Sequence, residues 1–209
     1  MGNNKKEVLD FFENHIIKYI VKDLEILNTI KADEKGSGAC SIPQASSTFS
    51  ALDLIGYLID PQDLKAVDMR FSSLLKNEKY FPQLAHFKQM DTFFESFRDN
   101  VRTYLAHRYL MTKYGITKID TDELFISDSG SEIFNVSFFT KISIKAINDI
   151  YRDISSDQFK INGYSNEKSL KKIKEKLDNL KSNEGKFNVT LTGILPSTVT
   201  LQTTKSLSD

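Results

Sequence analysis

The chain has no excess charge of either sign and almost no cysteine. Lys plus Arg and Asp plus Glu both total 28 among 209 residues, so no global field attracts nucleic acid or an anionic membrane. Contact with either would need a local patch. The single cysteine, Cys40, excludes an internal disulfide and is typical of a reducing compartment. We therefore expect a cytoplasmic protein.

Long hydrophobic runs are also missing. No stretch approaches the roughly 18 apolar residues that cross a bilayer, and the N-terminus lacks an apolar segment of signal-peptide length. We therefore expect no membrane contact. Hydrophobic residues at 40% and charged residues at 27% are typical of a globular protein. The length fits one domain, residues 1–209, that buries its own core.

The common metal and nucleophile motifs are absent from the sequence. It contains no His-x-x-x-His, Cys-x-x-Cys or Glu-x-x-His arrangement, so we expect no metal site and no cofactor. His15 and His86 have no carboxylate three or four residues away to orient them. Cys40 follows "GSGA", which lacks the lysine and the preceding strand of a phosphate loop. A Cys–His dyad stays a minor alternative.

Helical periodicity dominates the first half of the chain. Apolar residues of 5–31 predict a first helix of about seven turns. The stretch 32–44, with two glycines and Pro43, predicts a loop. Three more helices are expected at 46–60, ended by Pro61; at 63–81, stopped by Pro82; and at 90–115, with Asp91 as N-cap and Gly115 as C-terminal stop.

The period changes after these helices. Phe134, Val136 and Phe138 alternate with polar residues and follow a polar Asp-Ser-Gly-Ser turn, which predicts a β-hairpin over about 123–139. Helical spacing resumes at 140–154. The tail, about 186–203, alternates again and predicts two short strands that extend the hairpin or pair with another copy.

A lysine-rich helix is expected over 165–186. Leu170, Ile173, Leu177 and Leu180 form a narrow apolar stripe among seven lysines. Four acidic residues dilute that charge, so we favour a solvated helix packed along one seam over a nucleic-acid grip. The sequence therefore predicts a mainly α-helical domain with further helices at about 140–183 and a peripheral β-hairpin or small antiparallel sheet.

The stretch "VRTYLAHRYL" at 101–110 places an arginine and a histidine five positions apart. Arginine binds phosphate bidentately, and histidine moves protons near neutral pH. Together they suit phosphodiester cleavage without a metal. His107 would act as general base or acid on a ribose 2′-OH or a leaving oxygen, and Arg102 would hold the scissile phosphate.

The two side chains do not share one helix face. At about 100° per residue they lie roughly 140° apart around the helix axis, so one helix does not aim both at one point. A second copy, related by a two-fold axis, would complete such a site. Asn100, Thr103 and Tyr104 lie on the same face as His107 and would orient its ring or bind substrate.

Arg102, "TYLA", His107 and the following Tyr109 resemble the motif of the HEPN superfamily. The resemblance covers the helical core, about 5–113. It implies an up-and-down helical bundle, homodimerisation through the motif helix and, in many members, metal-independent endoribonuclease activity in toxin–antitoxin or phage-defence systems. An RNA substrate and an antitoxin or defence-system partner protein follow from it. It also implies catalysis by Arg102 and His107 and substrate binding by neighbouring side chains, namely Arg98, Asn100, Thr103, Tyr104 and Tyr109.

A structural interpretation of the motif stands beside the catalytic one. Asp99 lies three residues before Arg102, so an ion pair on the helix surface would account for the arginine. Core-like residues surround His107, and some HEPN members are non-catalytic scaffolds that bind without cleaving. The alternative is a helical dimerisation or interaction module. The phenylalanines are expected in the core, although Phe134 and Phe138 on an exposed strand would stack bases.

Overall fold

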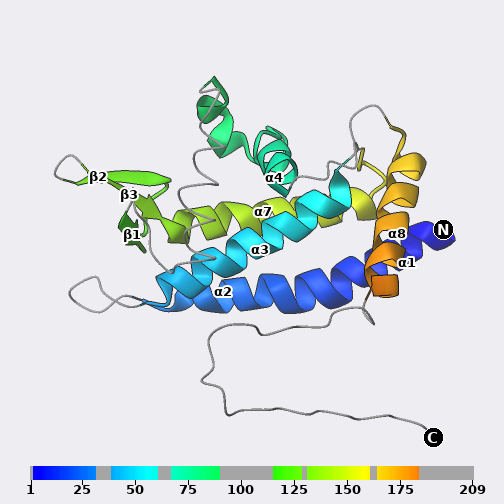
Figure 1. Ribbon diagram of the computed structural model, residues 1–209, viewed down its shortest axis with the longest axis horizontal. Coiled ribbons are helices and arrows are strands. Elements are labelled where there is room, and N and C mark those ends of the chain that lie inside the picture. Colours follow the sequence, from blue (N-terminus) through cyan, green and yellow to red (C-terminus); the bar gives the residue numbers. More distant parts are fainter. Residues whose placement is uncertain are drawn as a thin grey trace, which may run out of the picture.

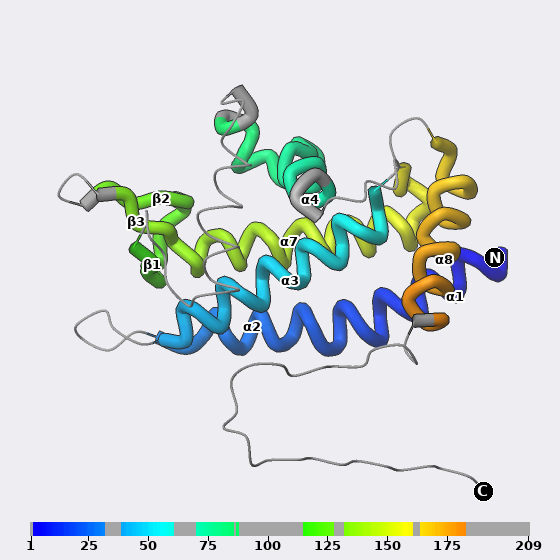
Figure 2. Tube along the Cα trace, in the orientation of Figure 1, coloured from blue at the N-terminus to red at the C-terminus, as the bar shows by residue number. Residues whose placement is uncertain are grey.

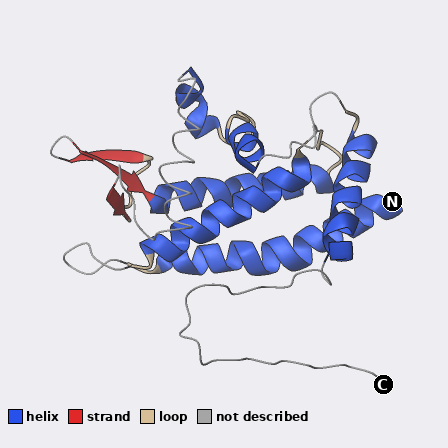
Figure 3. Ribbon diagram, in the orientation of Figure 1, coloured by secondary structure: helices blue, strands red, loops and turns tan. Residues whose placement is uncertain are grey.

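The computed structural model describes residues 2–31, 39–60, 67–89, 115–128, 131–160 and 164–183. Within these residues the fold is mainly helical, with a small sheet at one end (Figures 1 and 3). The elements, in chain order, are α1 (Asn3–Phe11), η1 (Phe12–Val21), α2 (Lys22–Thr29), α3 (Ser41–Ile59), α4 (Val67–Leu75), η2 (Pro82–Gln89), β1 (Gly115–Thr117), β2 (Phe125–Asp128), β3 (Ser131–Asn135), α7 (Val136–Ser155) and α8 (Asn166–Asn183). The predicted fold class is confirmed.

The first helix is continuous through α1, η1 and α2, as predicted, but its middle part is a π-helix. Val8, Phe12 and Ile16 are all buried and lie four residues apart. In an α-helix this spacing drifts around the axis. A π-helix bonds over five residues instead of four and winds more slowly, so the same spacing drifts in the opposite sense there and the buried residues stay near one face.

Helix α3 begins earlier than predicted, at Ser41, so residues 41–44 are helical rather than loop. Pro43 lies in the first turn, where its missing N–H would have had no intrahelical partner. At the other end, Gly56 faces helix α4. A Cβ there would lie 3.2 Å from the carbonyl oxygen of Arg70, so the glycine allows the close approach of the two helices.

The third predicted helix, 63–81, begins outside the described residues and ends earlier than expected. Helix α4 ends at Leu75, and a turn then leads to Phe81, which is fully buried. Pro82 does not simply stop the helix, because it is the first residue of the 3-10 helix η2. The fourth predicted helix, 90–115, lies outside the described residues except for Gly115. That glycine, predicted as a helix stop, is the first residue of strand β1.

The predicted hairpin exists as β2 and β3, with Phe125 opposite Phe134. The sheet is mixed rather than antiparallel, because β1 pairs parallel to β3 and gives the order β1-β3-β2. The predicted strand is wrong beyond Asn135. Val136 and Phe138 belong to α7, and the Asn135 side chain caps that helix by accepting from the Phe138 amide. The predicted β tail, 186–203, lies outside the described residues.

Helices α3 and α7 pack on α2, and α8 crosses beside α1 (Figure 2). A polar cluster lies buried where α2, α3 and α7 meet. Gln44 Nε2 donates to Asn28 Oδ1 at 2.8 Å and to Thr140 Oγ1 at 3.0 Å, and Thr48 Oγ1 lies 2.9 Å from Thr140 Oγ1. These bonds fix the register of the three helices. No helix in the described part of the chain is both long enough and apolar enough to span a bilayer.

Candidate functional site

All seven predicted site residues belong to the segment 90–114, outside the described residues. These are Arg98, Asn100, Arg102, Thr103, Tyr104, His107 and Tyr109. The geometry of the Arg-x-x-x-x-His motif is therefore a prediction from the sequence. The described residues on either side of it, and two clefts, give the structural setting.

Described residues before and after the motif segment contact the small sheet. Before it, Phe87 of η2 packs edge-on against Phe125 of β2, with ring centroids 6.3 Å apart. After it, Gly115 of β1 pairs with Ile133 of β3. Because β3 also pairs with β2, a described residue on each side of the motif segment contacts the same sheet.

A groove of about 630 Å³ lies beside this sheet. Its apolar part includes Phe87, Phe125 and Phe138. Charged side chains from β3, from α7 and from the loop before β2 surround this part. Lys141 Nζ, in this charged rim, lies 2.9 Å from Asp122 Oδ1, and Glu132 adds further negative charge. The carboxylates of the rim, Asp122, Glu123 and Glu132, outnumber its lysines, Lys141 and Lys145, so the groove is weakly negative and a poor phosphate site.

The phenylalanines proposed for base stacking are core residues. Phe134 is fully buried and packs against Phe49 and Phe139, with ring centroids at 6.3 and 5.5 Å. Phe138 is 7% exposed and lies on α7, not on a strand face. The prediction that they belong to the core is confirmed.

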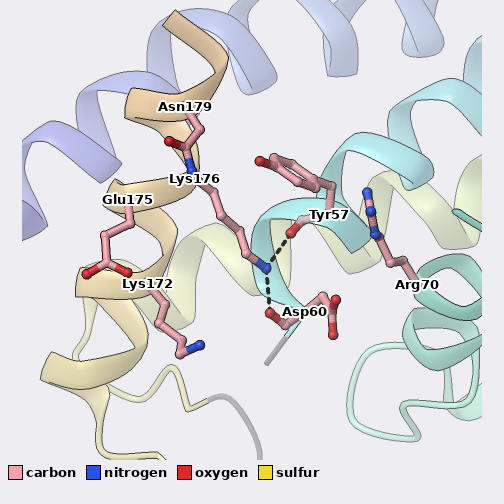
Figure 4. Close-up of a pocket in the computed structure, with 7 residues that line it drawn as sticks. All are labelled: Tyr57, Asp60, Arg70, Lys172, Glu175, Lys176 and Asn179. Carbon is pink, nitrogen blue, oxygen red and sulfur yellow. Dashed lines mark hydrogen bonds between the residues drawn. The ribbon is translucent and has the colours of Figure 1, made fainter. Parts of the chain in front are cut away.

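The second cleft, about 260 Å³, lies where α3, α4 and α8 meet (Figure 4). Lys176 reaches from α8 to the C-terminal end of α3, where its Nζ donates to the carbonyl oxygens of Tyr57 at 2.9 Å and of Asp60 at 2.5 Å. The last carbonyls of a helix have no intrahelical donor and carry partial negative charge. A buried ammonium satisfies both needs, so Lys176 caps α3.

Tyr57 is the aromatic centre of this cleft. The Arg70 guanidinium, from α4, lies 5.0 Å from its ring centroid, and Lys176 Nζ lies 5.4 Å away. Cations at this distance from an aromatic ring are attracted by its quadrupole. Lys172 also lines the cleft, while Asp60 and Glu175 offset part of the positive charge. The arrangement therefore joins three helices electrostatically.

The solvated-seam prediction for α8 is confirmed along most of its length. Leu170, Ile173 and Leu177 are buried, and Lys171 is exposed. It is wrong for Lys176, which is only 6% exposed. The spacing contained the signal, because Lys176 follows Ile173 by three residues and so occupies the buried face of the helix.

A second lysine caps a helix in the same way. Lys118, in the loop after β1, donates from Nζ to the Leu27 carbonyl at 2.6 Å and to the Ile30 carbonyl, at the C-terminal end of α2. Burial lowers the pKa of Lys118 below its usual value. Helices α2 and α3 are therefore each capped at the C-terminal end by a lysine that is distant in sequence.

The other candidate residues from the sequence, Cys40 and His15, do not lie together in one site. Cys40 is exposed and adopts a left-handed backbone conformation (φ 54°) before α3. The His15 ring lies on the exposed side of η1 with its centroid 5.0 Å from that of Phe11. No group of three or more metal-binding side chains occurs among the residues that the structure describes. Comparison with family models, curated proteins and solved structures finds no match.

Proposed function

We propose that the protein is a HEPN-like endoribonuclease that cleaves RNA without a metal ion. The observation that carries the proposal is the sequence of Arg102, four residues, His107 and then Tyr109, within a chain whose described part is mainly helical. In this proposal the chain is one HEPN-like domain, acts in the cytoplasm as a homodimer, and belongs to a toxin–antitoxin or phage-defence system with a partner protein.

The proposed reaction uses the RNA itself as nucleophile. His107 takes the proton from a ribose 2′-OH, and the 2′ oxygen attacks the adjacent phosphorus. The bond from phosphorus to the 5′ oxygen breaks, and that oxygen takes up a proton from water. The products are a 2′,3′-cyclic phosphate and a 5′-hydroxyl end. Arg102 binds the phosphate and offsets the charge that develops on it.

The test is RNA cleavage in EDTA by the wild type and by Arg102→Ala and His107→Ala. We expect the wild type to cut single-stranded RNA and each variant to lose at least about a hundredfold in rate, the scale of general acid–base catalysis. Arg152→Ala and His15→Ala are matched controls, because both side chains are exposed in the described fold. Circular dichroism checks that every variant folds. Full activity in His107→Ala would disprove the proposed mechanism.

A second function, a non-catalytic dimerisation or interaction module, is supported by a different observation. Two large side chains on the first helix, Tyr19 and Ile26, are 65% and 61% exposed, seven residues apart and so on one side of that helix. This alternative predicts no RNA cleavage by the purified wild type. It also predicts that substitutions in the motif segment change oligomeric state.

A further inference from the structure

The groove beside the small sheet has the size and lining of a small-molecule site. Its volume of about 630 Å³ lies within the roughly 300–1,000 Å³ that ligand pockets occupy. Five apolar side chains line it, three of them aromatic: Phe87, Leu124, Phe125, Phe138 and Ile142. Such a lining stabilises a bound molecule by removing its apolar surface from water.

The wall of the groove is held in place by the core behind it. The ring centroid of Phe125 lies 6.0 Å from that of Phe134, which is fully buried and opposite it in the hairpin. Asn135 accepts from the Phe138 amide and so fixes the first turn of α7. The same side chain donates to the Glu123 carbonyl at 3.1 Å, which fixes the loop before β2. A lining held in this way loses little conformational freedom when a ligand binds.

Both lysines of the groove are compensated by carboxylates. Lys141 Nζ lies 2.9 Å from Asp122 Oδ1, and Lys145 Nζ lies 2.5 Å from Asp149 Oδ2. Asp149 also pairs with Arg152, whose Nη2 lies 2.9 Å from Oδ1. The two ammonium groups therefore do not make the groove attractive to an anion.

Two other carboxylates of the groove have no such partner. Glu123 and Glu132 are exposed and form no ion pair among the residues that the structure describes. Gln83 of η2 also lines the groove, and its Oε1 is buried and accepts no hydrogen bond within the described part of the chain. The terminal torsion of glutamine is broad, so this oxygen can turn towards a donor. All three groups accept hydrogen bonds, so they favour a ligand with positive charge and N–H donors.

We propose that this groove binds a small organic cation, an aromatic body that carries a protonated amine or amidine. The body lies against the rings of Phe87 and Phe125, and the charged N–H groups face Glu123, Glu132 and Gln83. A quaternary ammonium fits less well because it has no N–H for Gln83, and an organic anion would be repelled by the two carboxylates. The proposal does not depend on ribonuclease activity, since none of these residues belongs to the motif segment.

Three probes that share a naphthalene ring test the charge of the ligand. They are 1-naphthylmethylamine, 1-naphthylmethanol and 1-naphthylacetate, each titrated into the full chain and followed by two-dimensional NMR. We expect the amine to bind with a Kd of about 0.1–2 mM, as its size suggests, at least about threefold tighter than the alcohol, with the acetate weakest. The shift changes should cluster at groove residues such as Phe125 and Ile142. Equal binding of amine and alcohol, shift changes elsewhere, or no binding at about 10 mM amine overturns the proposal.

Substitution of the carboxylates tests the site itself. In a double variant, Glu123→Gln with Glu132→Gln, the affinity for the amine should fall to about that for the alcohol, whose own binding should not change. Gln83→Met should also weaken the amine without lowering the urea midpoint, because the lost acceptor has no donor among the described residues of the free protein. Glu167→Gln is the matched control, because Glu167 is exposed on α8, at the other end of the fold from the sheet (Figure 1). Circular dichroism checks that every variant folds. Wild-type affinity for the amine in the double variant, or an equal loss in Glu167→Gln, overturns the proposal.

Discussion

Replacing Lys176 by methionine tests how the end of α3 is held. Methionine keeps most of the side-chain volume but removes the ammonium, so the Tyr57 and Asp60 carbonyls lose the donor now at 2.9 and 2.5 Å. A hydrogen bond from a charged donor contributes about 1.5–3 kcal/mol, and a cation at a helix C-terminus adds about 0.3–1 kcal/mol. Two such bonds and the cation at the helix end together stabilise the fold by roughly 3–7 kcal/mol.

The desolvation of Lys176 reduces this figure. The side chain is only 6% exposed, and burying an ammonium costs several kcal/mol, which the methionine variant recovers. We expect a net loss of about 2–3 kcal/mol in the free energy of unfolding. For a chain of this length that corresponds to a fall of about 4–12 °C in Tm.

The assay is urea unfolding followed by circular dichroism, with Lys171→Met as the control. Lys171 is exposed on the same helix, so its substitution should change stability by less than about 0.5 kcal/mol. A Lys176→Met variant as stable as the wild type, or a Lys171→Met variant equally destabilised, would refute the capping argument.

Two further predictions concern α3 and α7. Gly56→Ala should lower the free energy of unfolding by about 1–3 kcal/mol, because the alanine Cβ would lie 3.2 Å from the Arg70 carbonyl oxygen. This loss outweighs the better helix propensity of alanine, about 1 kcal/mol. A variant more stable than the wild type in urea unfolding would contradict the prediction. Burial raises the pKa of Tyr80 well above its usual value of 10.0, and its 2.9 Å bond to Asp153 raises it further. Unfolded tyrosine ionises near pH 10 while folded Tyr80 keeps its proton, so stability falls as pH rises above about 10. Tyr80→Phe should lower the free energy of unfolding by about 1–2 kcal/mol at pH 8 and should lose less stability than the wild type between pH 8 and 11. A variant whose urea midpoint falls as much as that of the wild type between these two pH values would contradict the assignment.

Helical periodicity predicted most of the described helices, because apolar spacing of three or four residues leaves a clear trace in sequence. Their boundaries were harder to predict. Helix α3 starts at Ser41 after Cys40, which makes no capping hydrogen bond with its side chain, so the usual N-terminal signal is missing. Pro43 looked like a helix breaker but fits the first turn.

The sheet shows where local patterns are insufficient. Strand β1 has only three residues, Gly115–Thr117, and forms because β3 offers it an edge. The alternation around Phe134 continued in the sequence past the point where Asn135 caps α7. That asparagine also donates to the Ile119 carbonyl at 3.0 Å, a contact between distant residues that spacing does not reveal.

Among candidate site residues, the sequence identified the motif in 90–114 but not the cleft at the end of α3. Lys176 could have been found, since it occupies the buried face of α8 beside Ile173. Tyr57 and Arg70 could not, because their proximity depends on the packing of α3 against α4. The functional prediction at Arg102 and His107 rests on the sequence motif.

The most direct test of the central proposal compares two oligonucleotides in EDTA. One carries a single ribonucleotide in an otherwise deoxyribose strand, at a position that the wild type cuts in RNA, and the other has 2′-deoxyribose there. We predict that the wild type cleaves only the first, leaves a 2′,3′-cyclic phosphate, and loses this activity on substitution of His107 by alanine. Equal cleavage of both strands, or unchanged cleavage by the His107→Ala variant, would contradict it.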